Sequence, residues 1–301
     1  MCWLAGVSRA GYYRALREQH PEEEDVEVRA AIQEIALGHH RRYGYRRIAA
    51  ELRRRGLQVN HKRVVRWMRE DNLLAIRQRR FVITTDSRHD LEVYLNLAKR
   101  MKLTAVNQLW IADLTYIRLQ SEFVYLAVIL DAWSRRVVGW ALDRSLGARL
   151  AVTALERAIA ARQPQPGLVH HSDRGIQYAS HDYASLLDQH AMTPSMSRPA
   201  NPYDNATCES FMKTLKQEEI YGRDYRDLAD LEVHVEEFLD RYYNQQRLHS
   251  ALGYRTPVEF EEHCTAQASQ AGVGAPKMSF FRHAEIYRPM SASGTSEGPD
   301  S

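Results

Sequence analysis

Three carboxylates stand at positions where regular structure would hold them in place. Asp113 lies inside the apolar segment 109–116, which predicts a strand, and a charge there is costly unless another group pairs with it. Asp173 directly follows a second apolar segment, 168–171, so it projects from a predicted strand end. Glu209 lies on a predicted helix, beside the apolar face formed by Cys208, Phe211, Met212 and Leu215 at helical spacing.

Carboxylates held in this way suit metal-assisted phosphoryl transfer. Mg²⁺ prefers oxygen ligands and is usually bound by a few carboxylates together with substrate phosphate. Two such ions, about 3.5–4 Å apart, can activate an attacking oxygen and stabilise a leaving one. The in-line transition state needs positioned charge more than covalent help. Asp113, Asp173 and Glu209 are therefore candidate ligands of a phosphoryl-transfer site.

The elements that must position these acids follow from the apolar pattern. The segments 109–119, 123–130 and 136–142 are rich in β-forming residues, and 123–130 is almost continuously apolar, as in a strand buried on both faces. Helices and strands then alternate, with helices predicted at 150–161, 183–191 and 204–219, strands at 168–171 and 193–197, and a last amphipathic helix at 228–243. This order predicts an α/β fold with a mixed sheet.

Residues 26–72 instead predict three short helices, the second ending at Gly56 and the third capped by Asn60. Two of them are joined by about five residues and the last displays cations, which is typical of a helix-turn-helix. A small helical bundle with a solvated basic face is the alternative. The density of arginine favours contact with phosphates, and the predicted DNA contacts are Arg46, Arg47, Arg53, Arg54, Arg55, Lys62, Arg63 and Arg66.

Charge is divided unevenly along the 301 residues, although the net value is only +3. Residues 1–105 carry 22 Lys and Arg against 13 Asp and Glu, a net charge of +9, and residues 106–301 carry 19 against 25, a net charge of −6. Within 41–80 the counts are 14 and 3. A basic block followed by a mildly acidic one indicates a polyanion-binding module joined to a different domain.

Several classes of protein are disfavoured. The longest apolar run, 123–130, has eight residues and is too short to span a bilayer. The N-terminus does not resemble a signal peptide, and the three cysteines form no C-x-x-C pair that would support a disulfide framework or zinc finger. We expect a soluble, cytoplasmic, nucleoid-associated protein.

Several local strings together resemble one family. They are Leu-Trp-Ile-Ala-Asp-Leu-Thr-Tyr at 109–116, His-Ser-Asp-Arg-Gly at 171–175, Asn-Pro-Tyr-Asp-Asn-Ala at 201–206 before Glu-Ser-Phe, and Tyr-Asn-x-x-Arg-x-His-Ser-Ala-Leu-Gly-Tyr-x-Thr-Pro at 243–257. With 59 residues between Asp113 and Asp173 and 35 between Asp173 and Glu209, the chain is similar to second-reading-frame (OrfB) insertion-sequence transposases, which have a retroviral-integrase-like D-D-E core.

The resemblance implies a ribonuclease-H-like core that cleaves DNA and joins element ends to a target. It implies that Asp113, Asp173 and Glu209 bind two Mg²⁺ (or Mn²⁺) ions and that Lys216 contacts DNA. The implied partners are double-stranded DNA, as element ends and target, further copies of the chain in a synaptic complex, and the product of an upstream overlapping frame. We exclude a membrane partner. Alternatives are a nuclease that only hydrolyses DNA and a non-catalytic DNA-binding regulator.

The expected organisation is an N-terminal segment (1–25), a helix-turn-helix-like DNA-binding domain (26–78), a linker (79–105), an integrase-like catalytic core (106–225), a C-terminal helix with the closing motif (226–264) and a flexible tail (265–301). Asp131 is a rival carboxylate, though a turn or ion-pair role is favoured. His170 and His171 are expected to pack and hydrogen-bond. Arg247 and His249 could either approach DNA or pack against the core.

Overall fold

The computed structural model describes residues 8, 23–75, 94–120, 122–197 and 206–270. The predicted linker over 79–93, residues 201–205 of the Asn-Pro-Tyr-Asp-Asn-Ala string, and the tail over 271–301 lie outside these residues. The chain divides into a compact unit, Met1–Glu262, and a second unit, His263–Ser301. Among the described residues, none of the helices combines the length and hydropathy needed to cross a membrane.

The basic N-terminal region folds into the three predicted helices, α2 (Glu23–Gly38), α3 (Tyr45–Arg54) and α4 (His61–Glu70). Their predicted apolar stripes are buried together, as Ile32, Ile48 and Met68 illustrate. The Asn60 side chain accepts a hydrogen bond from the Lys62 amide at 2.9 Å, so Asn60 caps α4 as predicted. α3 itself ends at Arg54, two residues before Gly56, which adopts φ +85°.

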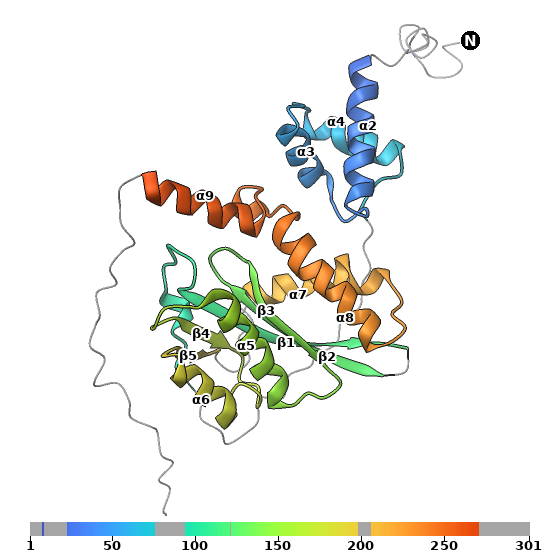
Figure 1. Ribbon diagram of the computed structural model, residues 1–301. Helices are drawn as coiled ribbons and strands as arrows, with labels where there is room; N and C mark the ends of the chain where they lie inside the picture. The colour runs from blue at the N-terminus through green and yellow to red at the C-terminus, as the bar shows by residue number, and fades with distance from the viewer. Residues whose placement is uncertain (1–7, 9–22, 76–93, 121, 198–205, 271–301) are drawn as a thin grey trace, which may run out of the picture. The chain divides into compact units, whose positions relative to one another are not determined.

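A five-stranded sheet forms the centre of the region predicted to be the catalytic core (Figure 1). Its strands are β1 (Leu109–Arg118), β2 (Phe123–Asp131), β3 (Val137–Asp143), β4 (Val169–Ser172) and β5 (Thr193–Met196), in the order β3-β2-β1-β4-β5. The first three strands are antiparallel, and β4 and β5 run parallel to β1. This confirms the predicted mixed sheet and gives it a ribonuclease-H-like topology.

Helices cover both faces of the sheet. Successive side chains of β1 point to opposite faces, so they pack against different helices. Trp110 and Ala112 belong to the core cluster that includes α5 (Ala148–Arg162) and α6 (His181–Gln189). Leu109 and Ile111 belong to the other cluster, with α7 (Ala206–Glu218) and α8 (Leu228–Glu236). Residues 110–112 are therefore buried on both sides, which explains their unbroken apolar sequence.

The C-terminal segment differs from its prediction. We predict one α-helix over 228–243, but α8 ends at Glu236 and continues as the π-helix Glu237–Tyr243. The wider turn buries Phe238, Leu239, Tyr242 and Tyr243 together. Short 3₁₀ turns occur at Ala98–Arg100, Ile220–Gly222 and Ser250–Leu252, and α9 (Pro257–Gln270) extends past residue 264, where we predict the tail to begin.

Gly139 allows α5 to approach β3 closely. A Cβ atom at this position would meet the Ala154 carbonyl oxygen and would lie 2.7 Å from the Cβ and 2.8 Å from the backbone nitrogen of Ala158. We expect Gly139→Ala to destabilise the fold by about 1–3 kcal/mol, because helix and strand must move apart. Urea denaturation would measure this. Gly38→Ala, which meets nothing within 4 Å, is the control, and equal midpoints for the two variants would contradict the expectation.

Candidate active site

Asp113 and Asp173 come from neighbouring parallel strands. In the β1–β4 pairing, Ile111 lies opposite His171, and both acids are two residues further along. Adjacent strands are about 4.8 Å apart, so the backbones of the two acids lie side by side. Asp113 Oδ1 accepts a hydrogen bond from the Leu114 amide, and Asp173 Oδ1 accepts one from the Gly175 amide, each at 2.9 Å.

Glu209 reaches the same region from α7. Its neighbour Cys208 is fully buried and donates a weak hydrogen bond to the Ile111 carbonyl oxygen at 3.8 Å. This contact places the start of α7 against β1, two residues from Asp113. The Glu209 side chain itself is exposed. The apolar face of α7 is buried as predicted, because Phe211, Met212 and Leu215 all pack into the core.

The charges of the other two acids act on Asp113. Burial, and then the charges of Asp173 and Glu209, raise the pKa of Asp113 to about 7. Lys216, on the same helix as Glu209, acts in the opposite direction on this pKa. The Lys216 ammonium is half-buried and lies 5.2 Å from the centre of the Tyr116 ring, where burial lowers its own pKa.

A divalent cation fits this donor set by its chemistry. The charges of Asp173 and Glu209 raise the pKa of Asp113, and a hard divalent cation would offset that repulsion. Among the described residues, no three His, Cys, Asp or Glu side chains converge closely enough to hold an ion together. Mg²⁺ is usually bound by one or two carboxylates, and substrate phosphate completes its shell.

Asp131, His170 and His171, the other titratable candidates near the strand ends, form hydrogen bonds within the fold. Both oxygens of buried Asp131 accept hydrogen bonds from backbone amides: Oδ1 from Trp133 and Ser134 in its own turn, at 3.0 and 2.9 Å, and Oδ2 from Asn107, just before β1, at 2.6 Å. Buried His170 bonds the Tyr183 hydroxyl at 3.0 Å. His171 bonds the hydroxyls of Ser195 at 2.9 Å and Ser197 at 3.0 Å. These residues pack and hydrogen-bond, as their positions in the sequence favour.

The cations of the helical region fall into two groups. Several are already paired with carboxylates: Arg47 with Glu218, Arg54 with Glu259, Arg55 with Glu34, Arg63 with Asp25 and, at 3.8 Å, Arg66 with Glu70. Arg46, Arg53 and Lys62 are exposed, and within the described ranges no carboxylate pairs with them. The spacing of charges along the chain does not reveal this division, because most of the paired carboxylates are distant in sequence.

The closing motif at 243–257 contacts the helical region. Its sequence is equally compatible with DNA contact and with packing. The Tyr43 hydroxyl donates to the Gln246 carbonyl oxygen at 3.1 Å and accepts from the Leu248 amide at 2.9 Å. Arg247 makes a buried, two-pronged ion pair with Glu218 at 2.7 and 2.8 Å. Arg247 therefore packs against the end of α7, the helix that carries Glu209.

The chain is similar to known proteins over most of its length. Residues 22–81 match the HTH-like domain family, and residues 104–202 and 190–257 match two families described as integrase core domains. The chain is 38% identical over 266 residues to the "Insertion element IS600 uncharacterized 31 kDa protein" of Shigella sonnei, covering 87% of this chain and 97% of that one. It is 35% identical over 270 residues to the "Transposase InsF for insertion sequence IS3A" of Escherichia coli (strain K12), covering 87% and 92%.

The chain belongs to the insertion-sequence transposases. The family predicted from the sequence is confirmed, as are the ribonuclease-H-like core and the helix-turn-helix-like region. The transposase is a polynucleotidyl transferase that cleaves DNA and transfers strands in a metal-dependent reaction. Among solved structures, the transposase is similar to the magnesium-bound catalytic core of HTLV-2 integrase, with 15% identity, a TM-score of 0.40 and coverage of 52% of this chain and 97% of that one.

Proposed function

We propose that Asp113, Asp173 and Glu209 are the catalytic carboxylates of this transposase and that they hold two Mg²⁺ ions, or Mn²⁺ in their place. The observation that supports the proposal is the β1–β4 register, in which Ile111 lies opposite His171, each two residues before one of the acids. The contact of Cys208 with Ile111 sets the start of α7, and so Glu209, against the same strand. Bound there, the ions would activate the attacking oxygen and stabilise the leaving one during cleavage and joining.

The residues of the chain would supply position rather than covalent chemistry. Asp113 and Asp173 are oriented by hydrogen bonds from backbone amides, so their oxygens are fixed before DNA arrives. Lys216, held over the Tyr116 ring, would contact a phosphate next to the scissile one. Its charge would offset part of the repulsion between the carboxylates and the phosphate.

The proposed partners are the two element ends and the target DNA. Joining two ends to one target requires at least two active sites, so we propose that the transposase works as a multimer on DNA. The exposed cations Arg46, Arg53 and Lys62 would contact phosphates of the element ends, in the manner of a helix-turn-helix region.

The exposed and the paired cations are expected to differ in salt dependence. Replacing Arg53 and Lys62 together by Ala should reduce the slope of log K against log salt by about 1.8, because two phosphate contacts are lost at about 0.9 each. Replacing Arg54 and Arg63 should leave the slope unchanged, since Glu259 and Asp25 already neutralise them. Fluorescence anisotropy of a labelled element-end duplex over a salt series would measure both slopes. Equal slopes for the two double variants would rule out this division.

The proposed reaction is tested by incubating the protein with labelled element ends, target DNA and Mg²⁺. Products in which labelled ends are joined to target support strand transfer. Nicked ends without joined products would support a hydrolytic nuclease, and binding without any cleavage would support a regulator.

A further inference from the structure

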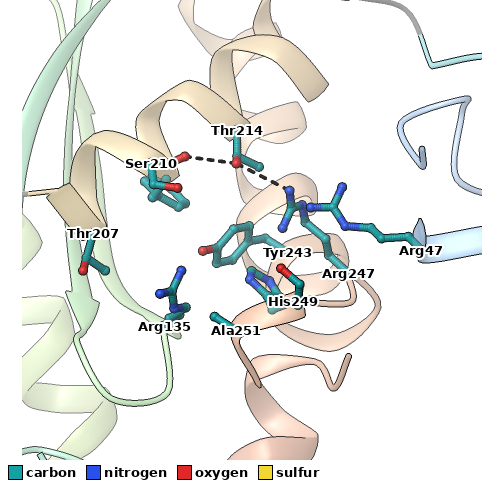
Figure 2. A pocket seen from close by; sticks show the side chains of 11 residues that line it. Arg47, Arg135, Thr207, Ser210, Thr214, Tyr243, Arg247, His249 and Ala251 are labelled. Carbon is teal, nitrogen blue, oxygen red and sulfur yellow. Dashed lines mark hydrogen bonds between the residues drawn. The ribbon is translucent and has the colours of Figure 1, made fainter. Parts of the chain in front are cut away.

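A pocket lies between α7 and the closing segment 243–251 (Figure 2), and Asp113, Asp173 and Glu209 are not among its lining residues. Its volume is about 110 Å³, enough for one tetrahedral oxyanion or a few waters of about 30 Å³ each. Three arginines and three hydroxyls of α7 line it: Arg47, Arg135, Arg247, Thr207, Ser210 and Thr214. Guanidinium and hydroxyl donors are the groups that recognise phosphate.

The positive charge of this pocket exceeds its negative charge. Glu218 is shared by Arg47, at 3.3 Å, and Arg247, at 2.7 Å. In the part of the chain that the structure describes, the Arg135 guanidinium has no carboxylate or carbonyl partner, and Figure 2 shows it on the opposite side of the pocket from Arg47. Three guanidinium charges therefore face one carboxylate, and the pocket has a local excess of two positive charges.

His249 provides a second observation that points to a ligand in this pocket. The residue is 5% exposed and lines the pocket, and its buried Nε2 atom has no hydrogen-bond partner among the described residues. Burial, and then the charges of Arg247, Arg47 and Arg135, lower the pKa of His249 to about 2. A buried polar atom without a partner is unfavourable, and an oxyanion with its hydration water would supply one.

Arg135 keeps its side chain in the pocket at a conformational cost. Its φ is +61°, a left-handed conformation that glycine adopts freely and arginine does not. The turn enforces it, because the Arg135 amide donates to the Asp131 carbonyl oxygen at 2.8 Å. A glycine at this position would relieve the strain.

We propose that this pocket binds a phosphate group of the DNA backbone, next to the strand that occupies the active site. The proposal rests on the proposed function for its DNA ligand and adds a second phosphate site to it. Glu209 and Ser210 are consecutive on α7 and about 100° apart around the helix axis. A DNA strand that crosses α7 can thus place one phosphate at the carboxylates and a nearby one in the pocket.

The test compares Arg135→Gly with the wild-type full-length chain in EDTA, where cleavage cannot occur. We expect Arg135→Gly to be at least as heat-stable as wild type. We expect its affinity for a labelled element-end duplex to fall on the order of tenfold, as for one lost charge-assisted contact. Its salt slope should fall by about 0.9. Arg149→Ala, which removes an exposed arginine from α5, is the charge-matched control and should change both quantities less.

A second variant keeps the test decisive if Arg135→Gly folds poorly. Ser250→Glu adds a carboxylate at the exposed rim of the pocket and should weaken duplex binding in the same way. Wild-type affinity and slope in both variants, or equal losses in Arg149→Ala, would overturn the proposal. A third result would also overturn it. If inorganic phosphate at matched ionic strength raises the Tm of the wild type, while both variants still bind the duplex normally, the pocket binds a free anion only. Since no metal is present, this result is separate from any failure of the carboxylate assignment.

Discussion

Asp113→Asn is expected to abolish DNA cleavage and strand transfer, with a loss on the order of 10²- to 10³-fold or more, as when a charge-stabilising group is removed from a preorganised site. Asparagine has the same shape and can still accept the Leu114 amide hydrogen bond. It removes the negative charge that a divalent cation requires. Cleavage of labelled element ends in Mg²⁺ measures the effect. Asp173→Asn and Glu209→Gln should behave in the same way.

The same variant should bind DNA and should be at least as stable as the wild type. The pKa of Asp113 is raised to about 7, so ionised Asp113 destabilises the native state when no metal is bound, and a neutral amide removes that cost. Gel shifts and thermal unfolding in EDTA would show this. Asp188→Asn, an exposed acid on α6, is the matched control and should remain active. Full cleavage by any of the three site variants would remove that residue from the proposed site.

Asp131→Ala should destabilise the fold by about 4 kcal/mol or more. The carboxylate is fully buried and accepts from three backbone amides and the Ser134 hydroxyl. Alanine would leave those donors without partners, and each such donor costs about 1–3 kcal/mol. At 2–4 °C per kcal/mol, Tm should fall by roughly 10 °C.

Circular dichroism melting would measure this loss. Asp182→Ala, at an exposed position in the first turn of α6, is the control and should lose far less. If Asp131→Ala has the same Tm as the wild type but fails to cleave DNA, Asp131 would instead belong to the metal site. Because the Asp131 turn also holds Arg135 in its left-handed conformation, the variant should weaken duplex binding as well.

Local patterns account for much of the fold. Asn60 is identified as a helix cap because the side chain of an N-cap acts on amides only two or three residues away. The strand holding Asp113 is predicted because its neighbours are apolar on both sides, which follows directly from burial on two faces. The break at Glu236 could not be predicted, since the buried aromatic face of 238–243 fits an α-helix and a π-helix almost equally well at the level of spacing.

The residues of the candidate site can be predicted from the sequence, but their arrangement in space cannot. Asp113, Asp173 and Glu209 are recognisable from their strings and spacing, but the proposal that they form one site depends on the parallel pairing of β1 with β4 and on the contact of Cys208 with Ile111. The family assignment is confirmed by the comparisons. The roles of the three acids remain a prediction that the variants above would test.

The sequence by itself therefore determined the family, the order of elements and the candidate carboxylates, because each depends on residues close together in the chain. Only the tertiary structure decided which cations are already neutralised and which remain available. Arg47 and Arg54 find carboxylates near the other end of the chain, whereas Arg135 faces a pocket built from three distant segments. Charge pairing depends on distance in space, falling off over a few ångströms, and the order of residues does not encode that distance.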